Sequence, residues 1–81
     1  MSRVSGKSDK DGTLVALGDA IRRLRAARGL TQEAFADEAE IDRSHMGKIE
    51  RGERNLTVLN VKRVAAALGL SVAALFEQAG L

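Results

Sequence analysis

The sequence predicts one small all-α domain, and three of its features support this prediction. The 81-residue chain has no proline, and its aromatic residues are two phenylalanines. Apolar residues make up 44% of the chain and are mostly Ala, Leu and Val, a composition that favours helices over strands. They recur at spacings of three and four positions, as on one face of a helix. A chain of this length has room for one core, so we expect a compact five-helix bundle.

The chain should begin with a segment that cannot fold by itself. Met1–Gly12 consists mainly of Ser, Gly, Lys and Asp with a single Val, so we predict a disordered tail and place the folded domain at residues 13–81. The basic residues of this tail could contact DNA phosphates. A disordered start or an expression remnant is the simpler explanation.

The first predicted helix spans about Leu14–Arg28. Its apolar stripe consists of Leu14, Leu17, Ile21 and Leu24. Gly29 follows as the residue best able to adopt the left-handed conformation that ends a helix, and Leu30 as the apolar residue that closes such an end. Spacing and termination signal together predict this helix.

The stretch Gln32–Arg51 predicts two short helices joined by a tight turn. Thr31 and Asp42 precede them as N-caps, since their side-chain oxygens can accept hydrogen bonds from the first free amides of a helix. The apolar residues that should face inward are Phe35, Ala36 and Ala39 in the first helix and Met46 and Ile49 in the second, and Ile41 lies in the turn. Glu40 occupies the turn position that would best suit glycine, because such turns often need a positive φ. The pattern predicts a helix-turn-helix, whose second helix can lie in the major groove of DNA.

The second helix of this pair should expose a polar and cationic face. That face is formed by Arg43, Ser44, Gly47, Lys48 and Arg51. Arg and Lys can donate to O6 and N7 of guanine, Ser can pair with several base edges, and Gly allows a close approach. We therefore predict that Arg43, Ser44, Gly47 and Lys48 contact bases. The alternative is that this stripe is only the solvated face of an amphipathic helix.

One charged residue of this helix, Glu50, should lie near its inward side. A carboxylate in that position is expected to meet a cation rather than solvent. Arg25 of the first helix is the candidate partner, which predicts a structural ion pair between Arg25 and Glu50.

Two further helices should complete the bundle. Thr57 and Ser71 are placed to cap them, and Gly69 and Gly80 to end them. The inward residues are predicted to be Val58, Val61, Val64, Ala65 and Leu68 in the first of these helices, and Val72, Leu75 and Phe76 in the second.

More apolar surface is present than five short helices can bury. The residues in excess are Leu59, Val72, Phe76 and Leu81. An exposed apolar patch on a small domain usually marks a partner surface, so we predict that these residues form a homodimer interface. The alternative is that they complete the core of a monomer.

Composition argues against several other classes of protein. There is no cysteine, and a single histidine, His45, cannot build a metal site, so we expect no metal and no cofactor. The longest apolar run, Val64–Leu68, is far too short to span a membrane, and the N-terminus has no apolar signal core. We therefore expect a cytoplasmic protein with no membrane partner. The sequence has no nucleophile–base pair and no glycine-rich phosphate loop, so we do not expect an enzyme.

The net charge of +2 is weak evidence for a nucleic-acid partner, but the distribution of charge is informative. One basic cluster in the first helix consists of Arg22, Arg23, Arg25 and Arg28. A second consists of Arg43, Lys48, Arg51 and Arg54. Clustered cations suit phosphates better than an even scatter, although solubility and ion pairs within helices could explain part of them.

About Leu14–Phe76 resembles the XRE family of helix-turn-helix proteins, which includes phage repressors and Cro. The motifs that carry this resemblance are GLTQE, IERGERN and AALGLSV. The resemblance implies a five-helix fold of the lambda-repressor-like DNA-binding type, usually a homodimer. Two positions depart from the family pattern: Glu40 replaces the customary turn glycine, and Gly47 replaces a more usual polar residue.

The resemblance also implies roles for individual residues. Phosphate contacts are implied for Gln32 at the start of the second helix and for Arg51, Arg54 and Asn55 around the groove. The predicted base-contacting residues match the family positions that contact bases, and the Arg25–Glu50 pair matches an ion pair of phage repressors. His45, at the edge of the outward face, is predicted to contact a phosphate, with a partly buried packing role as the alternative.

The run IDRSHMGKIERGERNLTVLNV is most similar to controller proteins of restriction–modification systems, although generic regulators share it. We therefore expect a transcriptional regulator that binds a palindromic operator in double-stranded DNA as a homodimer and has no small-molecule ligand. The competing hypothesis is an antitoxin or another protein-interaction module with the same fold.

Overall fold

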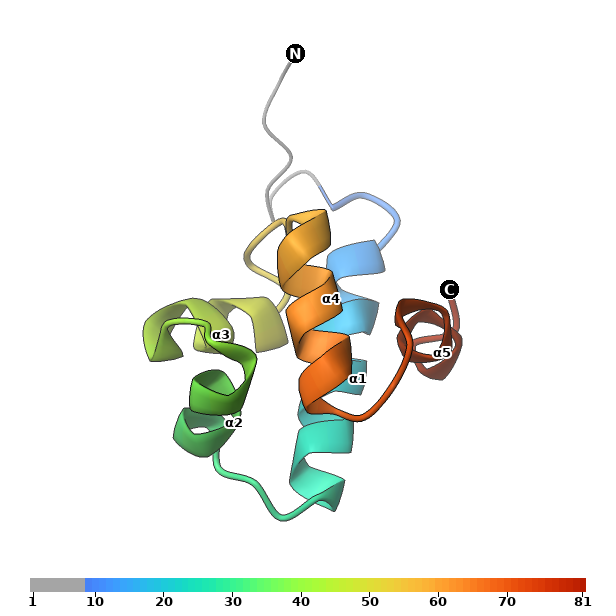
Figure 1. The fold of residues 1–81 in the computed structure, drawn as a ribbon. Coiled ribbons are helices and arrows are strands. Elements are labelled where there is room, and N and C mark those ends of the chain that lie inside the picture. Colours follow the sequence, from blue (N-terminus) through green and yellow to red (C-terminus); the bar gives the residue numbers. More distant parts are fainter. Residues whose placement is uncertain (1–8) are drawn as a thin grey trace.

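The computed structural model describes residues 9–81, which fold into five α-helices with no β-strand in that range. The helices are α1 (Thr13–Ala27), α2 (Gln32–Ala39), α3 (Arg43–Glu50), α4 (Val58–Ala67) and α5 (Val72–Gln78) (Figure 1). The predicted all-α class and the order of five helices are confirmed. Most of the predicted tail, Met1–Ser8, lies outside the described residues.

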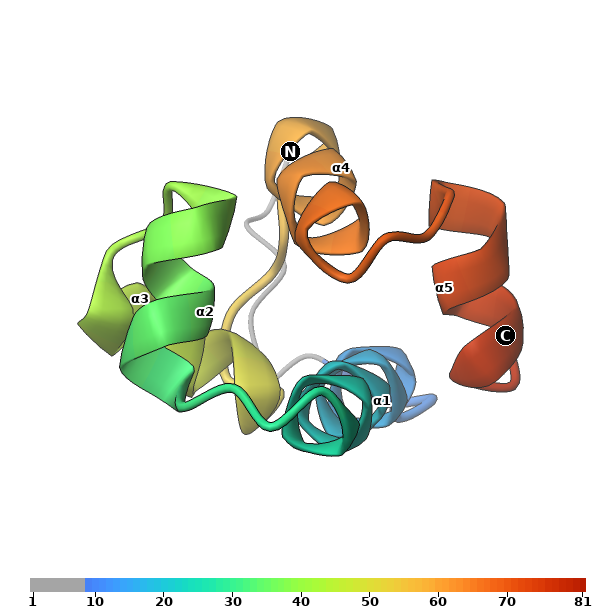
Figure 2. The same ribbon diagram turned by 60° about the horizontal axis from the view of Figure 1, so that its bottom comes forward.

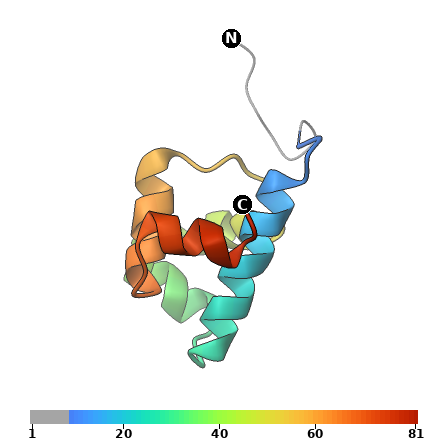
Figure 3. The same ribbon diagram turned by 90° about the vertical axis from the view of Figure 1, so that its right-hand side faces the viewer.

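The helices form two groups on either side of a central pair. Figure 2 shows α2 and α3 on one side of α1 and α4, and α5 on the other side. Helix α5 packs against both α4 and α1, and runs from one towards the other (Figure 3). The helix-turn-helix and the C-terminal helix are therefore on opposite sides of the domain.

Side-chain caps fix where four of the helices begin, as predicted. Thr31 accepts a hydrogen bond from the amide of Ala34 at 3.1 Å, and Thr57 and Ser71 bond the third amide beyond them in the same way. Asp42 accepts from the amides of Ser44 and His45. Each cap satisfies amide groups that have no partner within the helix, which stabilises a helix start by about 1 kcal/mol.

Helix α1 begins differently, because Gly12 has no side chain to act as a cap. The Asp9 carboxylate takes this role from upstream and accepts hydrogen bonds from the amides of Leu14, at 2.9 and 3.0 Å, and Val15, at 3.2 Å. The described part of the predicted tail, Asp9–Gly12, thus takes part in starting the first helix.

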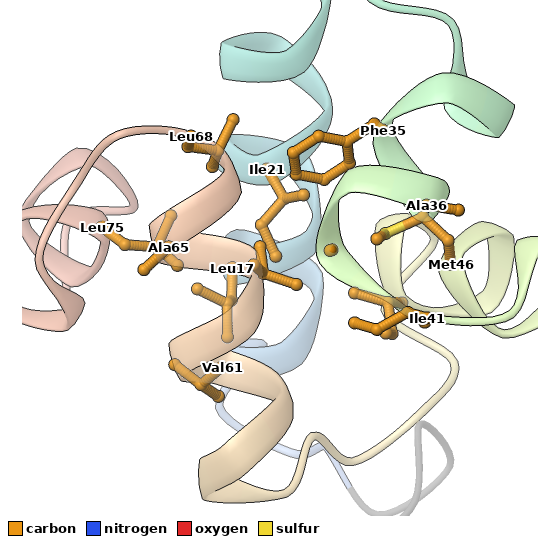
Figure 4. Close-up of a cluster of buried hydrophobic side chains, with 13 residues drawn as sticks. Leu17, Ile21, Phe35, Ala36, Ile41, Met46, Val61, Ala65, Leu68 and Leu75 are labelled. Atoms are coloured by element: carbon orange, nitrogen blue, oxygen red, sulfur yellow. The ribbon is translucent and has the colours of Figure 1, made fainter.

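One hydrophobic core joins all five helices (Figure 4). Its largest fully buried side chains are Phe35, Ile21, Met46, Ile49, Leu75 and Val64. The five inward residues predicted for the helix-turn-helix are all buried, at 2% exposure or less, and Ile41 of the turn is buried with them at 8%. Burial of this apolar surface is the main force that holds the short helices together, because helices of seven to ten residues are unstable alone.

The largest error in the predicted core is at the start of α4. Val58 was predicted to face inward but is 85% exposed, because it is the first helical residue and lies beyond the edge of the core. Val72 and Phe76 are half-buried and pack against the core, whereas Leu59 and Leu81 are 62% and 51% exposed. The alternative of a completed monomer core thus holds in part for Val72 and Phe76, but not for Leu59 and Leu81.

The turn between α2 and α3 contains a strained residue. Glu40 has φ 57° and ψ 42°, and it is the only non-glycine residue with a positive φ in the described chain. A left-handed conformation costs a residue with a Cβ about 1 kcal/mol. The amide of Ile41 still reaches the carbonyl of Ala36 at 2.9 Å, so the turn keeps its hydrogen bond despite this cost. The expected left-handed Glu40 is confirmed.

Two glycines allow α3 and the loop after it to approach α1 closely. A Cβ on Gly18 would lie 2.4 Å from the carbonyl oxygen of Ile49, which is backbone and cannot move aside. A Cβ on Gly52, which has φ 73°, would lie 2.7 Å from Cα of Val15. The crossing of α1 and α3 therefore depends on the absence of a side chain at position 18.

The predicted ion pair between Arg25 and Glu50 is present and links α1 to α3. Arg25 Nε donates to Glu50 Oε2 at 2.7 Å, and Nη2 donates to Oε1 at 3.0 Å. Arg25 Nη1 also donates to the carbonyl of Leu30 at 2.8 Å, and Gln32 Nε2 donates to Glu50 Oε1 at 3.1 Å. The Glu50 side chain is 2% exposed and that of Arg25 is 15% exposed. These bonds connect the end of α1, the start of α2 and the end of α3.

No single helix in residues 9–81 is long and apolar enough to cross a membrane. Helices α4 and α5 meet the length and composition requirement only as a pair bent by 81°.

Gly18→Ala should lower the free energy of unfolding by about 1–3 kcal/mol, because the added methyl group overlaps the α3 backbone. Gly47→Ala is the matched control in another helix. Its Cβ would lie 3.2 Å from Arg51 Nη1 and 3.3 Å from Gln32 Oε1, which are ends of flexible side chains. Since Ala favours a helix by about 1 kcal/mol over Gly, this variant should be as stable as the parent or more so. Urea denaturation would measure both, and equal losses would contradict the steric explanation.

Arg25→Ala should destabilise the domain by about 3 kcal/mol, because it leaves a buried carboxylate without its cation. Arg22→Ala removes an arginine whose pair with Asp19 is about half exposed, and should cost less than about 1 kcal/mol. The double variant Arg25→Met/Glu50→Met should recover most of the loss, because no uncompensated charge remains. Thermal or urea unfolding would measure this series. Similar losses in Arg25→Ala and Arg22→Ala would show that the buried pair has no special weight.

Candidate nucleic-acid interface

The first turn of α3 is exposed at the surface of the helix-turn-helix. Arg43 and Ser44 are exposed, His45 and Lys48 are half-buried, and the apolar residues of α3 are covered by the core. Because Asp42 caps the helix, the side chains of this turn are held at its N-terminal end. The structure thus places three of the four predicted base-contacting residues at or near one accessible surface.

Gly47, the fourth predicted base-contacting residue, is buried. The side chains of Gln32 and Arg51 lie over it, within 3.3 and 3.2 Å of where its Cβ would be. Gly47 provides a notch that these two side chains occupy, so its backbone is covered in the unbound protein. A base could approach Gly47 only after these side chains move.

Gln32 has a structural role that its sequence position did not reveal. Its side chain is half-buried and its amide group donates to the buried Glu50 carboxylate. The residue still begins α2, and the helix start is a favourable site for a phosphate because its amides point outward. A phosphate contact from Gln32 would therefore be made by a residue that is anchored to the core.

Two exposed arginines of this surface are held by carboxylates of the same chain. Arg43 Nη1 lies 3.4 Å from Glu33 Oε2, and Arg51 Nε donates to Glu53 Oε2 at 3.0 Å. The hydrogen bond with Glu53 raises the pKa of Arg51, and the same bond lowers the pKa of Glu53. The sequence alone did not indicate either carboxylate as a partner of these arginines. Since such exposed pairs contribute at most about 1 kcal/mol, both arginines can exchange to other partners.

Ser44 is also engaged in the unbound protein. Its hydroxyl donates to the Asp42 carboxylate that caps α3. This bond, followed by those from the backbone of His45 and Ser44, lowers the pKa of Asp42. The cap therefore contributes its full stability at pH values above the ordinary pKa of an aspartate. This contribution is lost as the pH falls through the lowered pKa of Asp42. At neutral pH, the Ser44 oxygen remains able to accept a hydrogen bond from a base or a phosphate.

Arg54 and Asn55 lie in the loop between α3 and α4, where both are exposed. Within the described chain, no ion pair or side-chain hydrogen bond holds either residue. Both side chains are therefore unengaged in the loop that follows the C-terminal end of α3.

The basic cluster predicted on α1 is not a continuous surface for phosphates. Arg22 and Arg23 pair with Asp19 at 2.9 and 3.0 Å, and Arg25 is committed to Glu50. Arg28 donates to the carbonyl of Ala67 at the end of α4. The cations of α1 mainly stabilise the bundle, which was the alternative considered from the sequence.

The structure offers no evidence of a metal centre. No group of three or more His, Asp or Glu side chains that could hold a metal ion occurs among residues 9–81.

Comparison with known proteins identifies the family. The family model HTH_3, described as helix-turn-helix, matches residues 21–75. The control protein C.MunI of Mycoplasma sp is 33% identical over 64 residues, which cover 78% of this chain and 86% of that protein.

Two restriction–modification controller proteins of known structure are also similar. C.AhdI from Aeromonas hydrophila is 43% identical with a TM-score of 0.75, covering 78% of this chain and 96% of that chain. C.Esp1396I, determined as a tetramer in complex with its natural 35 base-pair operator, is 31% identical with a TM-score of 0.76 and covers 83% of this chain and 88% of that chain. These similarities confirm the resemblance stated from the sequence motifs. The chain therefore belongs to the helix-turn-helix family of the XRE type and is a DNA-binding transcription regulator related to restriction–modification controller proteins.

Proposed function

We propose that this regulator is a controller-type protein that binds a palindromic operator as a homodimer, with α3 in the major groove. The observation that carries the proposal is the first turn of α3, where Arg43 and Ser44 are exposed beside Lys48 while the rest of the helix is anchored in the core. The similarity to C.MunI, C.AhdI and C.Esp1396I supports the controller assignment over an antitoxin. The proposed role is binding without catalysis.

The residues of the interface divide into two functional groups. Arg43, Ser44 and Lys48 would contact base edges, with Gly47 as the floor of the helix surface beside them. Arg and Lys match the acceptors of guanine, and each good bidentate contact discriminates by about 1–3 kcal/mol. The proposed phosphate contacts are Gln32, His45, Arg51, Arg54 and Asn55. They would fix the position of the protein on the duplex without specifying sequence.

A homodimer would use apolar residues of α4 and α5 and the residue Leu81 that follows α5. Leu59 and Leu81 are 62% and 51% exposed, and Val72 and Phe76 are half-buried. We propose that these four residues form the interface. A two-fold dimer would place two α3 helices in successive major grooves, about 34–36 Å apart.

Selection from random duplex DNA, with the mass of the protein in solution measured in parallel, tests the function. The expected result is an enriched palindrome with half-sites about one helical turn apart, bound by a dimer. If a correctly folded protein enriches no sequence, the proposal is wrong and the helix-turn-helix serves a protein partner.

Arg43→Ala should weaken operator binding by about 1–3 kcal/mol and relax the preference at one base pair in each half-site. Arg54→Ala should instead weaken binding to operator and unrelated DNA alike, and reduce the slope of log K against log salt by about 1. Arg63→Ala, an equal loss of charge at an exposed position of α4, is the control. Fluorescence anisotropy at several salt concentrations would measure all three. The site assignment fails if Arg43→Ala and Arg54→Ala behave like Arg63→Ala.

Leu59→Lys/Leu81→Lys should shift the protein from dimer to monomer, because it places charges in an apolar contact. Both leucines would be buried in the dimer, where a fully buried leucine contributes about 1.5–3 kcal/mol. Their loss should therefore raise the dissociation constant of the dimer by at least ten-fold. Ala27→Lys adds one charge at an exposed position of α1 and should leave the dimer intact. Sedimentation equilibrium would measure the masses. A double variant that dimerises as well as the parent would exclude this surface as the interface.

A further inference from the structure

The two carboxylates that pair with arginines of the interface differ in what their partners are proposed to contact. Glu53 pairs with Arg51, a proposed phosphate-binding residue, through Nε at 3.0 Å and Nη2 at 3.3 Å. Glu33 pairs with Arg43, the proposed base-contacting arginine, as an ion pair whose nearest atoms, Nη1 and Oε2, are 3.4 Å apart. The first pair lies within one short segment. The second connects the first turn of α2 to the first residue of α3.

The ion pair leaves the Arg43 guanidinium available. A guanidinium carries five N–H donors in a planar fork, and the nearest approach of Glu33 to it, 3.4 Å, is an ion pair without a hydrogen bond in the described chain. The guanidinium nitrogens can still donate two parallel hydrogen bonds to O6 and N7 of a guanine. The Arg43 and Glu33 side chains are 69% and 66% exposed, so DNA can reach the pair without unfolding of the domain.

We propose that Glu33 is a positioning residue that determines specificity, because it holds Arg43 in place for a base and disfavours its movement to a phosphate. This inference rests on the proposed function of Arg43. On the operator, Arg43 keeps Glu33 as a partner and gains the guanine. On unrelated DNA no guanine is in place, and Arg43 can contact a phosphate only by leaving Glu33. The loss of the ion pair then offsets part of the binding free energy that the phosphate contact contributes.

Simple competition between Glu33 and DNA would not have this effect. If Arg43 had to leave Glu33 on every DNA, the pair would weaken binding to operator and unrelated sequences by the same factor. Discrimination increases only if the pair persists on the operator, which an ion pair that occupies no N–H donor of Arg43 in a hydrogen bond permits. The Arg51–Glu53 pair provides the comparison, because phosphates are present on every sequence.

The test compares the parent with Glu33→Gln, Glu53→Gln, Arg43→Ala and the double variant Glu33→Gln/Arg43→Ala. Affinity is measured by anisotropy at one salt concentration for the selected operator and for duplexes with the Arg43-dependent base pair replaced. The ratio of the two dissociation constants gives the discrimination. Glutamine keeps the size of glutamate, and position 33 is exposed, so circular dichroism should show that each variant is folded.

Glu33→Gln should lower the discrimination by about two- to five-fold, the range expected for an exposed ion pair. Glu53→Gln should tighten binding to both duplexes by the same factor and leave the discrimination unchanged. In the Arg43→Ala background, Glu33→Gln should change the discrimination no further.

Two results with a regulator that discriminates normally would overturn this inference and leave the proposed function intact. One is an unchanged discrimination in Glu33→Gln, which would mean that the ion pair with Glu33 does not position Arg43 for a base. The other is a loss of discrimination in Glu33→Gln that persists in the Arg43→Ala background, which would mean that Glu33 contacts a base itself. A parent protein without any preferred sequence would overturn both proposals.

Discussion

The orientation of α3 depends on the buried ion pair between Arg25 and Glu50. The pair is bidentate, and its remaining hydrogen bonds reach the carbonyl of Leu30 and the amide of Gln32. It therefore ties the end of α1 to the start of α2 and the end of α3. Gly18 allows the α1 and α3 backbones to approach closely enough for this arrangement. A buried carboxylate that loses its cation is costly, so the pair stabilises this packing of α3 against α1.

Burial separates the structural charges of this domain from those available for binding. The Glu50 carboxylate is almost completely buried, and its pair with Arg25 is part of the fold. The pairs of Arg43 with Glu33 and of Arg51 with Glu53 are more than half exposed, so water screens them and their partners can exchange. DNA can therefore recruit exposed arginines without destabilising the bundle. The same type of interaction thus serves the fold in one place and recognition in another.

The two sides of the domain have complementary roles in the proposed regulator. The side that carries α2 and α3 includes the exposed residues Arg43 and Ser44, and the opposite side carries α5 (Figure 2). The apolar residues Leu59 and Leu81 are exposed outside the shared core. Because α1 and α4 lie between the two sides, the core that positions α3 also supports the surface proposed for dimerisation. Small size makes this arrangement useful, since a domain of 81 residues buries a limited apolar surface by itself.

The sequence by itself determined the class of fold, the helix boundaries to within about one residue, and the inward face of the helix-turn-helix. These features depend on local signals: caps at Thr31 and Asp42, a glycine after α1, and the spacing of apolar residues. The sequence also indicated the Arg25–Glu50 pair, because a carboxylate on an inward face requires a cation.

Only the tertiary structure decided which of the predicted site residues are accessible and which groups hold them. Gly47 is covered by Gln32 and Arg51, Val58 is exposed, and Glu33 meets Arg43 across the turn. The two contacts join residues on different helices, and the exposure of Val58 depends on where the core ends. Their geometry follows from how the helices cross, which spacing along one helix does not specify.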